Sequence, residues 1–165
     1  MTDVITELAA RAGAALKAAG ASLTTAESCT GGGIAEAITR ISGSSAWFGQ
    51  GWVTYSNKAK ARELGVPAEL LRQHGAVSEE VVRAMATAAA AKAGATWAVA
   101  VSGIAGPDGG SAEKPVGTVW LAWAGPGGEV VAELRCFPGD RSAVRRQTVE
   151  RALTGLLEKM GIASA

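Results

Sequence analysis

One short apolar run constrains the fold of this chain more than any other feature. Residues 97–102 read Trp-Ala-Val-Ala-Val-Ser, and no polar side chain interrupts the run before its last position. A strand that is apolar on both faces has to be covered on both faces, which is typical of strands inside parallel sheets flanked by helices. We therefore expect a central sheet with helices on either side of it.

The segments on both sides of this run alternate between helical and extended patterns. The sequence predicts helices at 2–19, 32–41, 57–64, 67–74, 79–93 and 141–160, and strands at 22–26, 50–55, 97–102, 116–124 and 129–137. Thr2 is the expected cap of the first helix, and the glycine-rich turn 125–128 indicates a hairpin between the last two strands. This order predicts a three-layer α/β/α sandwich around a mixed, mostly parallel sheet of about five strands, in one domain spanning residues 1–165.

The composition argues against several classes of protein. A net charge of +1 provides no bulk attraction to nucleic acid or to a membrane surface. No apolar run approaches the length of a membrane span and the N-terminus lacks a signal pattern, so we expect a cytoplasmic location. Cys29, Cys136 and the single histidine, His74, lack the spacing of metal ligands. We expect neither a metal nor another cofactor.

The segment 43–60 concentrates groups that suit nucleophilic catalysis. It places Ser44 and Ser45 in a loop, the single tyrosine, Tyr55, at the end of a strand, and Lys60 in the first turn of a helix. A serine hydroxyl needs a neighbouring base, and a lysine can act as one when burial or the positive end of a helix dipole lowers its pKa. The sequence by itself does not show whether Ser45 and Lys60 meet.

A second segment supplies rival groups. Residues 27–33, Glu-Ser-Cys-Thr-Gly-Gly-Gly, follow a strand and lead into a helix, where backbone N–H groups are oriented to bind an anion or another ligand. Ser28, at the end of the strand, is the alternative nucleophile to Ser45. Cys29 lies at the same helix start, where a thiolate would be favoured, although an inert buried thiol is the simpler interpretation.

Three of the predicted strands end in polar, glycine-rich loops. Because ligands bind outside the carboxyl ends of parallel strands, we expect one cleft lined by 28–33, by the segment after Tyr55 and by 102–117. Arg141, at the entrance of the last helix, is the best candidate for binding an anion there. For Arg145 and Arg146, one turn further on, a solvated helix face is an equal alternative. Asp108 and Glu113 are interpreted as solvated turn residues.

Several stretches, in the same order, resemble one known family. They are 25–32, 43–45, 54–57 with Lys60, 75–78, and 102–111 with 114–118. Over nearly its whole length the chain is similar to the nicotinamide-nucleotide amidohydrolases, a domain also found at the C-terminus of CinA-type competence/damage-inducible proteins. The resemblance implies hydrolysis of nicotinamide mononucleotide to nicotinate mononucleotide and ammonia. Members often carry an N-terminal domain similar to molybdopterin-binding proteins, and we expect this chain to be the stand-alone form.

The resemblance also implies roles for single residues. Ser45 matches the family nucleophile and Lys60 its base, while Tyr55 relays the proton or orients Lys60. Backbone N–H groups at 44–46 are the expected donors to the oxyanion. The residues expected to bind the substrate are Ser28, Thr30, Gly31, Gly32, Ser102, Gly103 and Arg141.

Two other classes of function compete with an enzyme. The same glycine-rich loops suit a non-catalytic nucleotide-binding or regulatory module. A nucleic-acid-binding domain is disfavoured by the near-zero net charge. We expect a small-molecule partner, nicotinamide mononucleotide, and neither nucleic acid nor membrane. The sequence leaves open whether the chain forms a homodimer or a higher homo-oligomer.

Overall fold

A five-stranded sheet forms the centre of the molecule. The computed structural model describes residues 3–162, and its strands are β1 (Leu23–Glu27), β2 (Phe48–Val53), β3 (Trp97–Gly103), β4 (Thr118–Ala124) and β5 (Val130–Cys136). The strands lie in the order β2-β1-β3-β4-β5. β1 is parallel to both of its neighbours, whereas β4 is antiparallel to both of its own. Within this sheet only β4 is reversed, so the predicted mixed, mostly parallel sheet is confirmed.

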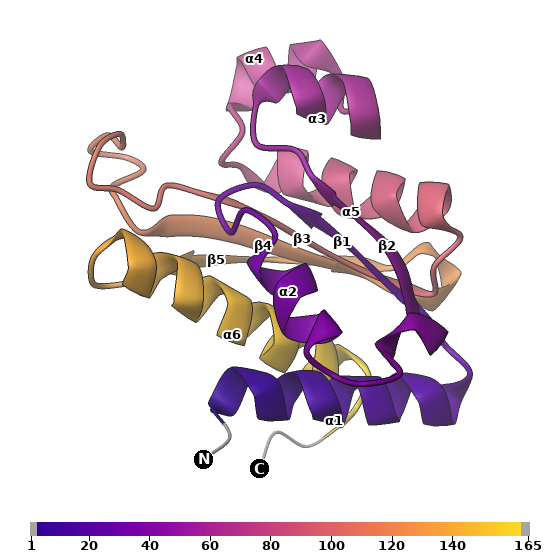
Figure 1. Ribbon diagram of the computed structural model, residues 1–165. Coiled ribbons are helices and arrows are strands. Elements are labelled where there is room, and N and C mark those ends of the chain that lie inside the picture. The colour runs from indigo at the N-terminus through magenta and orange to yellow at the C-terminus, as the bar shows by residue number, and fades with distance from the viewer. Residues whose placement is uncertain (1–2, 163–165) are drawn as a thin grey trace.

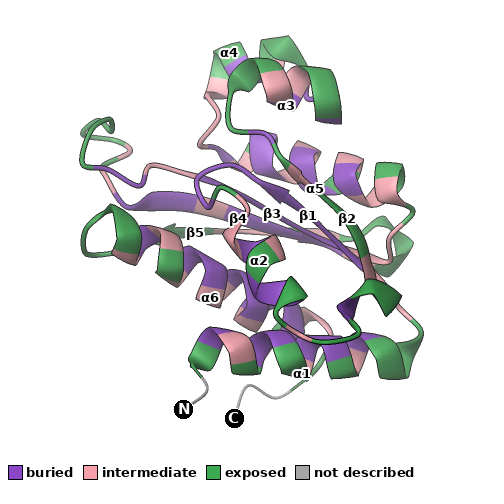
Figure 2. Ribbon diagram, viewed as in Figure 1, coloured by how far each residue is buried: buried purple, intermediate pink, exposed green. Residues whose placement is uncertain are grey.

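Helices cover both faces of the sheet (Figure 1). One layer contains α1 (Val4–Ala19), α2 (Gly33–Thr39) and α6 (Arg141–Lys159), and the other contains α3 (Asn57–Leu64), α4 (Ala68–His74) and α5 (Glu79–Ala93). Figure 2 shows the buried residues gathered in the sheet and on the helix faces turned toward it. The three-layer α/β/α sandwich is therefore confirmed. No helix within residues 3–162 is long and apolar enough to cross a membrane.

The apolar run that predicted this architecture is the buried middle of the sheet. Val99 and Val101 belong to the core between the sheet and the layer of α1, α2 and α6. Ala98 and Ala100 alternate with them and face the layer of α5. Because side chains alternate between the faces of a strand, the larger valines fill one core while the small alanines let the alanine-rich α5 approach closely.

Side-chain caps fix where several helices begin. The side chains of Ser56, Ser78 and Asp140 each accept a hydrogen bond from a backbone N–H three residues ahead, at α3, α5 and α6. The cap predicted at Thr2 lies outside the described residues, and α1 is instead capped by Asp3, whose carboxylate accepts from the Thr6 N–H at 3.0 Å. A short polar side chain at this position satisfies an N–H that would otherwise lack a partner.

Candidate active site

The carboxyl ends of β1, β2 and β3 meet at one edge of the sheet. Glu27, at the end of β1, is in register with Val53 of β2 and Val101 of β3. The chain adds β2 on one side of β1 and β3 on the other, and such a change of direction leaves a crevice outside the strand ends where ligands bind. A pocket of about 280 Å³ lies there, lined by residues from these three strand ends and from the start of α6.

Lys60 reaches this pocket from α3 and contacts Ser28. Its Nζ donates hydrogen bonds to Ser28 Oγ at 2.9 Å and to the carbonyl of Thr54 at 2.8 Å. The side chain is only 1% exposed, and no carboxylate in residues 3–162 pairs with its amine. Burial disfavours the ammonium form and lowers the pKa of Lys60 from 10.5 to about 8. Near neutral pH a useful fraction of Lys60 is an uncharged amine that can accept the Ser28 proton.

The turn that carries Ser28 joins the end of β1 to the start of α2. The Ser28 N–H donates to the carbonyl of Val101 at 3.1 Å, and its own carbonyl accepts from the Gly31 N–H at 3.0 Å. Gly31 and Gly32 both have positive φ values, +57° and +100°, which glycine adopts without a steric penalty. Ser28 follows Ala26 on the α5 side of the strand, which is the side from which Lys60 approaches.

The same turn offers hydrogen-bond donors beside Ser28. In the described part of the chain, the backbone N–H groups of Cys29 and Thr30 donate to no other residue. Cys29 lines the pocket, so its N–H is a candidate donor to a group bound there. Burial raises the pKa of the Cys29 thiol to about 12, so it stays protonated, consistent with the interpretation of an inert thiol.

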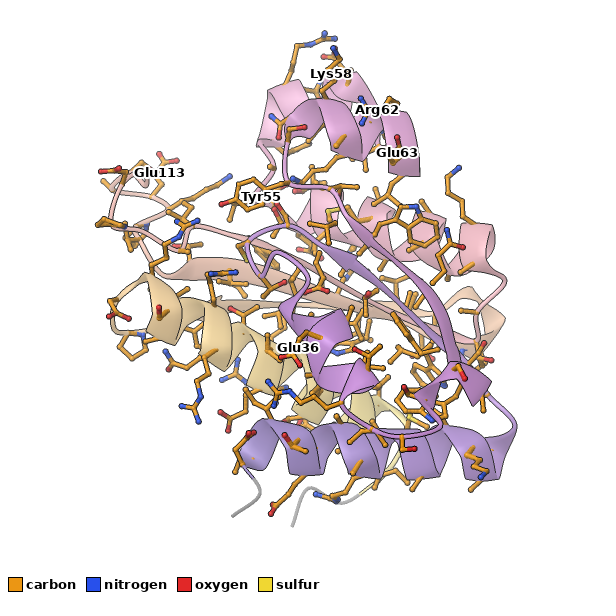
Figure 3. All side chains as sticks on the ribbon, viewed as in Figure 1. Glu36, Tyr55, Lys58, Arg62, Glu63 and Glu113 are labelled. Carbon is orange, nitrogen blue, oxygen red and sulfur yellow. The ribbon has the colours of Figure 1, made fainter. Side chains whose placement is uncertain are left out.

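Tyr55 and Arg141 connect the loops around the pocket mouth. Arg141 donates through Nη2 to Tyr55 Oη at 2.7 Å and through Nη1 to the carbonyl of Gly106 at 2.9 Å. Figure 3 shows Tyr55 between α3 and the glycine-rich loop that follows β3. Both side chains line the pocket, as do Ser102 and Gly103. Arg141 still has free donor positions because a guanidinium carries five N–H groups, so it can bind an anion at the mouth.

Ser45 does not lie in this pocket. It is an exposed residue of the short 3₁₀ turn η1 (Ser44–Ala46), which precedes β2. Lys60 packs beyond the other end of β2, and six residues of strand at about 3.3 Å each separate the two by roughly 20 Å. Ser45 and Lys60, which the resemblance pairs as nucleophile and base, therefore do not meet in this structure, because the extended strand does not fold back. The oxyanion donors expected at 44–46 are equally distant from Lys60.

Three of the expected substrate ligands also lie outside the pocket lining. Thr30, Gly31 and Gly32 belong to the same turn as Ser28 but do not line the pocket. The Thr30 hydroxyl instead donates to the carboxylate of Glu27 at 2.5 Å. The sequence predicts a site for an anion or another ligand at this turn, but Gly31 and Gly32 lie outside the lining of the pocket and shape the turn into α2.

The three neighbouring arginines of α6 separate into two groups. Arg141 lines the pocket of Ser28, whereas Arg145 and Arg146 line a second cleft of about 300 Å³ between α1, α2 and α6. Arg145 also donates to the carbonyls of Cys29 and Thr30 from this second cleft. The geometry thus favours Arg141 as the anion ligand of the first pocket.

Glu27 is not among the residues predicted from the sequence, although one feature of the sequence pointed to it. A charged residue that ends a buried strand is costly unless it is hydrogen-bonded, and it directly precedes a helix that begins with glycines. Glu27 is fully buried and accepts three hydrogen bonds.

Across residues 3–162, no group of three or more His, Cys, Asp or Glu side chains is arranged to hold a metal ion.

Comparisons with known proteins agree with this architecture. The model of the CinA C-terminal domain matches residues 5–160. The chain is 66% identical, over 94% of its length and 97% of the relative's, to the nicotinamide-nucleotide amidohydrolase PncC of Pseudomonas putida. It is 59% identical to the PncC protein of Escherichia coli strain K12, over 96% of this chain and 97% of that one. A crystal structure of a CinA superfamily protein from Klebsiella pneumoniae superposes with a TM-score of 0.92 at 44% identity, covering 95% of this chain and 98% of the other.

Proposed function

The chain belongs to the CinA C-terminal domain family, and from this premise we propose that it is a nicotinamide-nucleotide amidohydrolase that uses Ser28 as nucleophile and Lys60 as base. Relatives that match it over nearly their whole length carry that name. The observation that supports the residue assignment is the 2.9 Å hydrogen bond between Lys60 Nζ and Ser28 Oγ in a pocket at the strand ends.

The first half of the proposed reaction forms an acyl-enzyme. The uncharged amine of Lys60 takes the proton of Ser28 as Oγ attacks the carboxamide carbon of the substrate. The carbonyl oxygen becomes an oxyanion, which accepts a hydrogen bond from the Cys29 N–H. The Lys60 ammonium then gives its proton to the amide nitrogen, the C–N bond breaks, and ammonia leaves.

The second half repeats the same steps with water. Lys60, again uncharged, takes a proton from a water molecule that attacks the ester carbon, and the resulting ammonium returns a proton to Ser28 as the C–O bond to Oγ breaks. The product is nicotinate mononucleotide. Lys60 is therefore the base in both halves of the reaction, and its amine is uncharged again at the end of each half.

Release of ammonia tests the proposed function directly. Purified protein incubated with nicotinamide mononucleotide should produce equal amounts of ammonia and nicotinate mononucleotide. A non-catalytic nucleotide-binding module would bind the nucleotide, as seen by calorimetry, and release no ammonia. Binding without release of ammonia would contradict the proposed activity, but not the fold or the family membership.

Arg141 is expected to recognise the phosphate of the substrate. Arg141→Ala should lower kcat/KM for nicotinamide mononucleotide by about a hundredfold, since hydrogen bonds to charged groups contribute about 1.5–3 kcal/mol each and about 1.4 kcal/mol corresponds to a factor of ten. Nicotinamide riboside, which lacks only the phosphate, should be a poor substrate of the wild type and should be little affected by the substitution. Remote binding of this kind can also lower the chemical barrier.

The matched control is Arg146→Ala, because Arg146 lies one turn further along α6 and lines the other cleft. It should leave kcat/KM for both substrates within about twofold, as surface substitutions usually have small effects. Specificity constants for both compounds on the two variants decide the matter. An equal loss on nucleotide and riboside in Arg141→Ala would show that Arg141 acts by holding Tyr55 and the loop, not by binding phosphate.

A further inference from the structure

A buried carboxylate lies directly behind the turn that carries Ser28. Glu27 is the last residue of β1 and is 0% exposed. Its Oε1 accepts hydrogen bonds from Thr30 Oγ1 at 2.5 Å and from the Ile34 N–H at 2.8 Å, and its Oε2 accepts from the Ala35 N–H at 3.1 Å. No lysine or arginine in residues 3–162 forms an ion pair with it. Hydrogen-bond donors at the start of α2 compensate its burial instead.

These contacts replace the cap that α2 lacks. The residue before the helix is Gly32, which supplies no side-chain hydrogen bond, so the first N–H groups of α2 need other acceptors. A cap from the adjacent residue would stabilise only the helix. Glu27 accepts from across the turn, so it also fixes the start of α2 relative to the end of β1. The position of residues 28–32, which connect these two elements, depends on both the end of β1 and the start of α2.

Arg145 holds the same turn from the side of α6. It donates through Nε to the Cys29 carbonyl at 3.2 Å and through Nη2 to the Thr30 carbonyl at 3.3 Å. Because C=O and N–H point in opposite directions across a planar trans peptide, holding the Cys29 carbonyl toward Arg145 directs the Thr30 N–H away from α6. The turn is thus held by a carboxylate on one side and by a guanidinium on another.

We infer that Glu27 is a positioning residue for hydrolysis at Ser28: its carboxylate holds the turn so that the Ser28 hydroxyl and the Cys29 N–H keep the geometry needed for attack and for oxyanion binding. The inference rests on the proposed function, because it concerns the reaction assigned to Ser28. Glu27 is not itself a lining residue of the pocket and makes no hydrogen bond to Lys60, so it acts through the turn and not on the substrate.

Electrostatics and positioning predict opposite results when the charge is removed. A negative charge near the oxyanion donors disfavours the oxyanion, so removing it without moving any atom should leave the rate unchanged or raise it. Glu27→Gln keeps the size of the side chain but replaces one acceptor oxygen with an NH₂ group. That group must face at least one of the donors at Thr30, Ile34 or Ala35, so the turn or the helix start has to move.

The test compares Glu27→Gln with Glu36→Gln. Glu36 is an exposed glutamate on the same helix, paired with Arg40 (Figure 3). For Glu27→Gln we expect kcat for nicotinamide mononucleotide to fall by about ten- to a hundredfold, since small misplacements of reacting groups cost factors of this size. KM should stay within about twofold, and the pH of half-maximal kcat should not move, because burial rather than a carboxylate sets the pKa of Lys60. Glu36→Gln should match the wild type in all three quantities.

Three results would overturn the inference. An unchanged kcat with a lower melting temperature would make Glu27 a purely structural cap. A raised kcat, or a pH profile displaced to lower pH, would make its role electrostatic. All rates are measured well below the melting temperature and normalised to the folded fraction from circular dichroism. If the wild type releases no ammonia, the proposed function itself is refuted. If the wild type is active and Glu27→Gln has the same kcat, only the inference about Glu27 is refuted.

A second pair of variants keeps the test decisive if Glu27→Gln does not fold. Thr30→Val removes one donor to the carboxylate and preserves the backbone contacts of Ile34 and Ala35. It should lower kcat several-fold with KM unchanged. Thr39→Val is the control, because its hydroxyl bonds carbonyls within α2 and faces solvent. Equal kcat values for the two threonine variants would contradict the inference.

Discussion

Ser28→Ala should lower the turnover of nicotinamide mononucleotide by at least about a thousandfold, because it removes the atom that we propose as the nucleophile. The substitution deletes one hydroxyl at a 7% exposed position, and the Lys60 amine keeps its hydrogen bond to the Thr54 carbonyl. The protein should therefore fold normally. Steady-state ammonia release and a thermal melt on the same preparation provide the two measurements.

Ser45→Ala is the matched comparison, since it is the same substitution at the serine that the family resemblance favoured. Ser45 is exposed in η1, at the far end of β2 from Lys60, and its removal should leave kcat within about twofold. The reverse pattern, with an inactive Ser45→Ala and an active Ser28→Ala, would refute the assignment of Ser28. Ser45 would then have to reach Lys60 in some arrangement other than this one.

Lys60→Arg should be nearly as inactive as Lys60→Ala, with a loss of about a hundred- to ten-thousandfold in kcat, the usual range for a general base. Arginine keeps the positive charge but does not deprotonate in proteins. For the wild type, only the unprotonated amine can accept the Ser28 proton, so kcat should rise with pH and reach half of its maximum near pH 8. Profiles of kcat against pH, with circular dichroism as the check on folding, give the answer.

Lys58→Arg is the control for this substitution, because Lys58 is an exposed residue on the same helix (Figure 3). It should retain the activity and the pH profile of the wild type. If Lys60→Arg preserves the rate, Lys60 is only an electrostatic partner of Ser28 and another group must take the proton. A wild-type kcat that falls as the pH rises from 7 to 9 would also contradict the assignment of Lys60 as the base.

Most of the architecture could be predicted from local patterns. The apolar run 97–102 predicts a strand covered on both faces, and the turn 125–128 predicts the hairpin that makes β4 and β5 antiparallel. Both depend on residues close together in the sequence. The helix caps at Ser56, Ser78 and Asp140 depend on contacts only three residues apart.

The proposed pairing of Ser28 with Lys60 could not be predicted from such patterns. Ser28 and Ser45 are the same residue type, each in a loop next to a strand, and only the order β2-β1-β3 places the end of β1 beside the lysine that follows β2. Burial of Glu27 depends likewise on N–H groups seven and eight residues later in the chain. The order of the strands and contacts between separate elements determine which residues meet in the site. Neither can be predicted from the local sequence pattern.

The position of the Lys60 amine also links folding to the proton. An unfolded lysine has a pKa near 10.5, and the folded value is about 8. Between these two values the unfolded chain holds a proton that the native protein has released, so unfolding in mild alkali takes up a proton from the buffer. This contribution to the free energy of unfolding is fully present above about pH 10.5 and is lost as the pH falls through about 8. The buried amine that we propose as the base therefore lowers the free energy of unfolding at neutral pH relative to its value in alkali.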